Sequence, residues 1–467
     1  MSDSITKMWL VYLLLLPFNL TFFMGKGQVM PADFILPVLL VLAVPKLFRR
    51  FGEIARGDYP VLLYLVLFAL IAALAGFREG LGRALVVALG AQAVVLTIYF
   101  VFRASVVSSR DFIRLTVFWV WVSTAAAGIS VFFVVLGYLG WETPLVRWYP
   151  SLGPGAWRLI GTVGHTPNFA YSYFHIGFFL SVGLLLAVKS GVRDVSGLNI
   201  SIRNIWIAAA VHSLAIFLTY SRGVIGGILG LVIITQAIRS RLGRSAILYK
   251  TALWVAFAGL LAYGTIFFTY TTDALFTASQ AEADSLRLDK SSPHFRGYSY
   301  KNVQHLPDGA GYIRLPGGLT FLPAPHWYLL KTCWRFFTEN PLSGVGPGRF
   351  PDEMEALRDS GAGDLPHTLP KQKPHSTWIG ALAEGGLPGF AGLIILWAFF
   401  LTGAVKRRLK DDPLGLAIYA AIAGYVIVGL NMDVMNFRWL WLLFALAVTR
   451  AGLMDQDIRS PEPDTSQ

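Results

Sequence analysis

The sequence is poor in charge and in cysteine. Only 14% of its 467 residues are charged, where a soluble domain usually carries about 25%. The single cysteine, Cys333, leaves no intrachain disulfide, so cysteine usage says nothing about the redox compartment. These shortages exclude an ordinary soluble domain and a small disulfide-stapled one.

Several motifs that carry common chemistry are also missing. The sequence has no glycine-rich nucleotide-binding loop, no zinc-ligand spacing and no Gly-x-Ser-x-Gly element. It shows no internal repeat and no heptad array. We therefore expect no ATP hydrolysis, no metal and no cofactor.

Long apolar runs take the place of these motifs. Hydrophobic residues make up 55% of the chain, and the mean hydropathy is +0.57. Runs of about 20 apolar residues match the length that crosses a bilayer as a helix, and spans must be helices or closed barrels. Because the runs are continuous rather than alternating, a β-barrel is disfavoured. The sequence predicts an all-α, polytopic membrane bundle with about twelve spans. They lie at about 8–24, 32–47, 60–77, 84–102, 112–139, 169–188, 205–220, 224–238, 252–270, 387–405, 414–430 and 434–449.

The chain divides into four predicted regions. Residues 1–270 carry nine spans, 271–374 form one large irregular and helical outer loop, 375–450 hold an interfacial helix and three spans, and 451–467 form a disordered tail. One set of loops holds 18 lysines and arginines and the short loops opposite hold seven, which places the first set and both termini in the cytoplasm. The net charge of +12 follows from these loops, so we expect no nucleic-acid partner.

A histidine stands where the long polar segment meets the next apolar run. His375 precedes Ser376 at an expected helix start, and an imidazole there can take a proton from a substrate hydroxyl near neutral pH. The alternative is that both residues merely begin an interfacial helix. Glu384 lies two and a half helical turns further on and hence on the opposite face, so we interpret it as a helix-end residue. The glycine pair ending at Gly386 predicts a break before the span.

Arg222 lies between two apolar runs with almost no loop between them. A charge at mid-bilayer costs about 2.5–3.5 kcal/mol on insertion scales, and arginine holds phosphate in bidentate fashion. We interpret Arg222 as part of an anion site, with a snorkelling interface residue as the alternative. Arg158 precedes a glycine-rich turn and is a second candidate phosphate ligand. His165 and Asn168 follow in the same turn and could line the same site. The alternative for these three is a solvated loop.

A glycine-rich stretch lies inside the predicted outer loop. Gly344, Gly346 and Gly348 alternate with other residues and predict a rigid irregular loop rather than a helix. Residues 327–337 before it are aromatic and amphipathic, which is typical of a helix at a membrane surface. We favour a solvated charge for Arg335 on that helix, with a substrate contact as the alternative.

Three of these stretches, in this order, resemble the O-antigen ligase and bacterial polysaccharide polymerase superfamily. They are Ser221-Arg222-Gly223, Pro341-Leu342-x-Gly344-Val345-Gly346-Pro347-Gly348-x-Phe350, and His375-Ser376-x-x-Ile379 with Ala383-Glu384-Gly385-Gly386-Leu387-x-Gly389. The resemblance covers about residues 158–389. It implies transfer of a glycan from undecaprenyl diphosphate to an acceptor sugar hydroxyl at the periplasmic face of the bacterial inner membrane, without nucleotide sugar, ATP or metal.

The resemblance also implies roles for residues. His375 matches the family's general base, and Arg222 and Arg158 match arginines that hold the donor diphosphate. The acceptor is lipid A–core in ligases and another lipid-linked repeat unit in polymerases. A transporter of an anionic substrate and a non-catalytic scaffold are the alternatives from other classes.

Two positions depart from the family pattern. Ser376 replaces the asparagine that usually follows the histidine. An arginine expected some fifteen residues before Pro341 falls on His326, which leaves its role open among His326, Arg314 and Arg335. The further candidate substrate contacts are His326, Arg335, Asn168 and Ser376.

Overall fold

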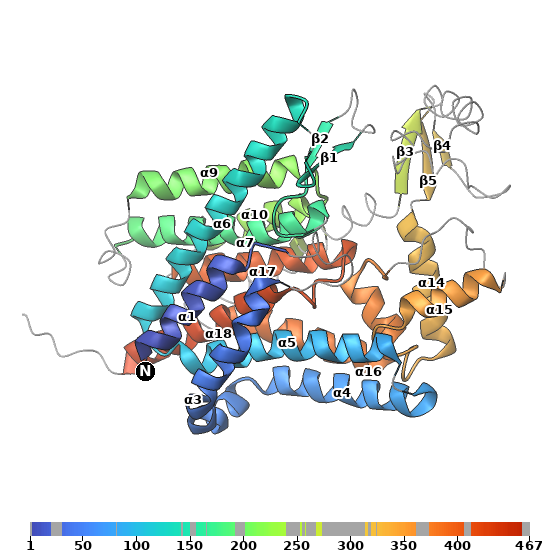
Figure 1. Ribbon diagram of the computed structural model, residues 1–467, viewed down its shortest axis with the longest axis horizontal. Coiled ribbons are helices and arrows are strands. Elements are labelled where there is room, and N and C mark those ends of the chain that lie inside the picture. Colours follow the sequence, from blue (N-terminus) through green and yellow to red (C-terminus); the bar gives the residue numbers. More distant parts are fainter. Residues whose placement is uncertain are drawn as a thin grey trace, which may run out of the picture.

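The structure, a computed structural model, is a bundle of helices with two small sheets (Figure 1). It describes residues 2–19, 30–80, 82–141, 143–149, 156–164, 166–191, 201–239, 253–254, 257, 268–272, 313–315, 319–323, 325–360, 373–405 and 412–459. The helices of this part are α1 (Ser2–Leu15), the 3-10 helix η1 (Pro31–Phe34), α3 (Leu36–Gly57), α4 (Tyr59–Glu79), α5 (Arg83–Ser105), α6 (Ser109–Tyr138), α7 (Pro167–Lys189), α9 (Ile202–Leu218), α10 (Val224–Arg239), α14 (Pro325–Glu339), α15 (Phe350–Asp359), α16 (Thr377–Val405), α17 (Pro413–Asn431) and α18 (Arg438–Arg459).

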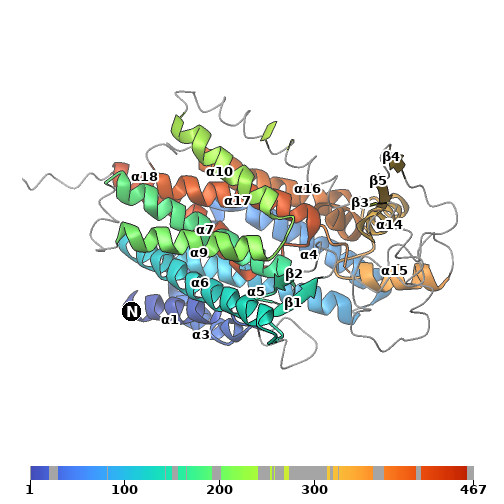
Figure 2. The same cartoon turned by 90° about the horizontal axis from the view of Figure 1, so that it is seen from above.

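The two ends of the bundle carry different elements. Helix α1 begins and α18 ends at one end, whereas α14 and α15 lie at the other, as Figure 2 shows. We call the second the α14 end. The connection from α9 to α10 and the start of α16 both lie there, so the span ends predicted to share one side of the membrane do share one end of the bundle.

Six helices in the described part of the chain are long and apolar enough to cross a membrane: α4, α5, α6, α7, α16 and α17. Helices α1, α9 and α10 are apolar but shorter. This supports a multi-pass membrane protein, while the total of twelve spans stays a prediction. Helices α7 and α17 are 78% and 83% buried over their apolar windows, which places them at the centre of the bundle.

The described strands correct the all-α prediction. Strands β1 (Val146–Tyr149) and β2 (Ala156–Leu159) form an antiparallel hairpin, and β3 (Phe268–Thr272), β5 (Leu319–Pro323) and β4 (Ile313–Leu315) form a sheet in that order. Their aromatic and β-branched residues suit strands. Because β3 begins at Phe268, the predicted span 252–270 is wrong at its end; most of its remaining residues lie outside the described part.

Several predicted helix boundaries are also wrong. Helix α1 ends at Leu15 rather than near 24, since Pro17 cannot donate a backbone hydrogen bond and disfavours helix at the residue before it. Helix α3 begins at Leu36 and continues to Gly57 instead of ending near 47. Helix α18 begins only at Arg438 and runs to Arg459. The tail predicted to be disordered from 451 is therefore helical at first, because Leu453 is only 5% exposed and packs in the core.

Glycine pairs let α10 cross α17 closely. A Cβ atom added to Gly424 would lie 2.7 Å from the Gly226 carbonyl oxygen, and one added to Gly226 would overlap the Gly424 carbonyl oxygen. Small residues at such crossings let helix backbones approach within a membrane. The close approach fixes α10 against the central helix α17.

Candidate functional site

The site is built around two histidines at the α14 end. His375 lies just before α16, and its ring centroid is 5.5 Å from that of His326, the second residue of α14. The backbone of His375 is left-handed, with φ of 52°. Such a conformation costs about 1–3 kcal/mol outside glycine and persists only where the surroundings enforce it.

Contacts from the two residues after His375 enforce its conformation. The Ser376 hydroxyl donates to the Gly429 carbonyl at 3.2 Å and accepts from the Ile379 N–H at 3.5 Å. The Thr377 hydroxyl donates to the Met432 carbonyl at 2.9 Å and accepts from the Val434 N–H at 2.9 Å. The start of α16 is thus tied to the end of α17 and the loop that follows it.

These contacts place Ser376 at the cap of α16. Serine and asparagine are both favoured at helix N-caps, so the serine keeps a structural task that the family's asparagine can also perform. Its buried hydroxyl serves that task. A contact of Ser376 with substrate stays a prediction.

Asp433 is a residue that the sequence analysis missed. It lies between the two residues that bind Thr377, and its carboxylate accepts from the Met435 N–H at 3.1 Å and from the Asn436 side chain at 2.6 Å. Its negative charge raises the pKa of His375, although burial and then Lys373 lower that pKa to below its ordinary value. The sequence signal that could have revealed Asp433 is its position as a carboxylate between the apolar runs 414–430 and 434–449.

His326 is uncharged at neutral pH. Burial, followed by the nearby His375 and Arg222, lowers the pKa of His326 to about 3. The Arg222 charge acts on His326, and the ring of His326 contacts that of His375, so the predicted anion site and the predicted base lie at the same end of the bundle. A neutral His326 does not supply the positive charge of the arginine that the family pattern expects.

Arg158 and Asn168 hold the loop that carries Arg222. The Arg158 guanidinium donates to the carbonyls of Thr219 and Tyr220 through Nε and Nη2, the second contact at 3.2 Å. Tyr220 has a left-handed φ of 46°. Arg158 therefore supports this strained turn from strand β2, two residues before Arg222.

The other side of the same loop rests on α7. The Ser221 hydroxyl donates to the Asn168 side-chain carbonyl at 2.8 Å and accepts from the Gly223 N–H at 3.2 Å. A Cβ atom on Gly223 would overlap the ring of Tyr171, so only glycine fits after Arg222. His165, which was predicted to line the same site, lies outside the described residues.

The glycine-rich stretch forms an irregular loop, as predicted. Gly344, Gly346 and Gly348 have φ of +60°, +98° and +76°, values that favour glycine. This glycine loop, residues 341–349, lies against a break in α16 at Gly386, where φ is 59° and ψ is −159°. The Leu387 N–H donates to the Pro341 carbonyl at 2.8 Å. The predicted helix break is confirmed.

Comparison with known proteins identifies the same region. Residues 207–394, less than half of the chain, match the family model described as O-antigen ligase. This match supports the resemblance of this part of the chain to the O-antigen ligase-like superfamily. A search of the curated proteins found no match. Arg222, His326, the glycine loop and His375 lie inside the matched O-antigen ligase domain, whereas Arg158 and Asn168 precede it.

The O-antigen ligase domain and the apolar helices together indicate a multi-pass membrane enzyme of the ligase or polymerase type. Within it, Arg335 is removed from the histidines. It lies nine residues after His326 on α14 and pairs with Glu339 at 2.7 Å, with 40% of its side chain exposed. This placement favours the solvated-charge interpretation. Arg314 lies on β4 opposite Thr320.

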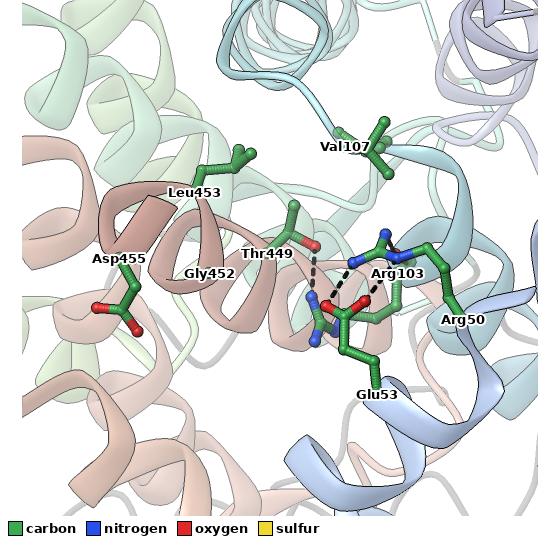
Figure 3. Close-up of a pocket in the computed structure, with 9 residues that line it drawn as sticks. Arg50, Glu53, Arg103, Val107, Thr449, Gly452, Leu453 and Asp455 are labelled. Carbon is green, nitrogen blue, oxygen red and sulfur yellow. Dashed lines mark hydrogen bonds and ion pairs between the residues drawn. The ribbon is translucent and has the colours of Figure 1, made fainter. Parts of the chain in front are cut away.

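A charged cavity of about 200 Å³ lies at the other end of this O-antigen ligase-like protein (Figure 3). It is lined by Arg50, Glu53, Arg103, Val106, Val107, Thr449, Gly452, Leu453 and Asp455. Arg103 pairs with the buried Asp58 at 2.9 Å, and Arg50 pairs with Glu53 at 2.8 Å. Each guanidinium already has a carboxylate partner, so these groups do not form a second anion site. The Arg103–Asp58 pair ties α5 to the turn between α3 and α4, and the Arg50–Glu53 pair lies within α3.

Proposed function

We propose that the protein transfers a glycan from undecaprenyl diphosphate to a hydroxyl group of an acceptor sugar on lipid A–core, at the periplasmic face of the bacterial inner membrane. The observation that supports this proposal is the ring contact between His326 and His375, at the end of the bundle where the charge of Arg222 also acts on His326. The three come from segments far apart in the sequence, and all lie within the O-antigen ligase domain.

His375 acts as the general base in this proposal. The acceptor hydroxyl gives its proton to the neutral imidazole while its oxygen bonds to the anomeric carbon of the donor glycan. The bond from that carbon to the diphosphate oxygen breaks in the same step. Because the pKa of His375 lies below its ordinary value, the imidazole is neutral and able to accept a proton at pH 7.

Arg222 stabilises the leaving group. Undecaprenyl diphosphate departs with its negative charge, and a fixed guanidinium placed beforehand stabilises that charge without a metal. Arg158 is the second proposed diphosphate ligand, and through Thr219 and Tyr220 it also holds the Arg222 loop. His326 stays neutral and orients the acceptor or His375 by hydrogen bonding.

Glycan transfer in purified membranes tests the base. With lipid-linked glycan and lipid A–core supplied, His375→Ala should lower the rate by about 10²–10⁴-fold, the usual contribution of a positioned base, while the protein level stays normal. His375→Gln keeps a polar side chain without a base of suitable pKa and should be as slow. Normal transfer by either variant contradicts the assignment.

The acceptor is tested in a deletion strain. If the protein is a ligase, surface polymer on lipid A–core disappears and lipid-linked polymer accumulates. Accumulation of single lipid-linked repeat units would instead show a polymerase of the same superfamily. Full surface glycan together with loss of uptake or export of an anionic solute would show a transporter.

A further inference from the structure

We propose that Glu384 is a positioning residue that fixes the glycine loop to α16 and thereby holds His326 beside His375. This inference rests on the proposed function for its effect on glycan transfer. The sequence indicated only a helix-end residue at this position. The structure places its carboxylate between α16 and the loop that joins α14 to α15.

Both oxygens of the Glu384 carboxylate bind this segment. One accepts from the Gly348 N–H at 2.9 Å and the other from the Phe350 N–H at 3.3 Å. Phe350 is the first residue of α15, and the N–H groups of a first helical turn have no partner within their own helix. A carboxylate is also favoured at the positive end of a helix dipole. Glu384 therefore stabilises the start of α15 by hydrogen bonding.

Backbone contacts also attach the glycine loop to α16, and we call this attachment the joint. The Val345 N–H donates to the Ala383 carbonyl at 2.9 Å, and the Gly346 N–H donates to the Glu384 carbonyl at 3.0 Å. A Cβ atom on Gly344 would lie 2.6 Å from the Ala383 carbonyl oxygen. The loop thus lies directly on the α16 backbone, one turn before the break in that helix.

A small apolar core connects this joint to His326. It contains Leu329, Cys333 and Phe336 of α14, Phe350 and Met354 of α15, and Ala383 of α16. His326 lies one turn before Leu329 on the same helix. Because α14 packs on α16 through this cluster and the glycine loop beside it, a shift of the loop moves His326 relative to His375.

Cys333 offers a native reporter of the joint. It is the single cysteine of the chain and is 1% exposed. Burial raises the pKa of its thiol, and the neighbouring Glu384 carboxylate raises it further. The thiolate form of cysteine attacks a maleimide, and Cys333 is buried, so Cys333 reacts only when α14 separates from α16. No cysteine has to be introduced.

The experiment compares Glu384→Gln, Glu384→Asp and Glu355→Gln in the full-length protein. Glutamine keeps the shape but sets an NH₂ group against one of the two N–H donors. Labelling of Cys333 by a maleimide should become about ten- to a hundredfold faster in Glu384→Gln, the ratio that corresponds to losing one hydrogen bond to a charged group. Glu355 lies on α15 with its side chain 40% exposed, so Glu355→Gln removes a carboxylate without touching the joint and should label as slowly as the unmodified protein.

Transfer kinetics show whether the joint positions the histidines. In Glu384→Gln, kcat should fall with little change in the donor KM, because Arg222 lies on a different loop. Glu384→Asp keeps the charge and should recover part of both kcat and Cys333 protection. Unchanged Cys333 labelling in Glu384→Gln overturns the proposal, and so does fast labelling with normal kcat. Should the unmodified protein transfer no glycan, the proposed function fails, while Cys333 labelling still decides whether Glu384 holds the joint.

Discussion

Replacing Gly226 with alanine should separate α10 from α17 and displace Arg222, which lies four residues before it. The added methyl group would overlap the Gly424 carbonyl oxygen and lie 3.1 Å from the Gly424 carbonyl carbon. Non-bonded carbon atoms prefer about 3.5–4.0 Å, so the helices have to move apart by roughly 0.5–1 Å. Overpacking of this kind costs about 1–3 kcal/mol.

The displacement should affect transfer more than stability. A misplacement of about 1 Å at a reacting centre can cost on the order of 10²-fold in rate, and α10 carries the shift towards the loop of Arg222. Gly226→Ala should therefore lower the transfer rate by about that factor and weaken binding of the lipid-linked donor. The assay measures transfer per folded protein, together with donor affinity and the midpoint of thermal unfolding.

The next residue provides a matched control. A methyl group on Gly227 would lie 3.4 Å from the Tyr171 hydroxyl and 3.8 Å from Nδ1 of His175, which is ordinary contact. Gly227→Ala should transfer glycan at nearly the normal rate. If Gly226→Ala is as active as Gly227→Ala, the close crossing of α10 and α17 does not position Arg222 and this reasoning is refuted.

Two further predictions concern charge. Arg222→Lys should restore little of the donor affinity lost in Arg222→Ala, because lysine cannot make the bidentate phosphate contact; equal affinity for the lysine variant and the unmodified protein would show that Arg222 is only an interface anchor. With the pKa of His375 below its ordinary value, kcat should be flat between pH 7 and 8 and fall only below the ordinary histidine pKa of about 6.5. Asp433→Asn removes the charge that raises this pKa, so a pH–rate profile should show the acidic fall at still lower pH, and an unmoved profile would contradict the role of Asp433.

The sequence was sufficient to place Arg222 and His375 at the same end of the bundle. Both stand at ends of apolar runs, and membrane topology confines such ends to one of two surfaces. The glycine loop and the break at Gly386 were also predictable, because glycine spacing and the following proline are local signals. The break is seen within α16, and the loop lies against it.

Contacts between segments far apart in the chain could not be predicted from the sequence. Glu384 binds amides 34 and 36 residues away, and Thr377 binds residues 55 and 57 away. Helical periodicity placed Glu384 and His375 on opposite faces of a helix, but it gives no information on partners outside that helix. The hairpin β1–β2 was missed because its four-residue strands are too short for an alternating pattern to stand out beside long apolar runs.

The tie between Thr377 and the segment after α17 has a consequence for biogenesis. His375 takes its left-handed conformation beside residues that the ribosome adds only after α17 is complete. A nascent chain that ends within α16 carries His375 and Arg222, the proposed base and diphosphate ligand, but lacks the residues that support the conformation of His375. If His375 is the base, the protein therefore becomes active only after the segment that follows α17 has been made, and shorter chains cannot transfer glycan.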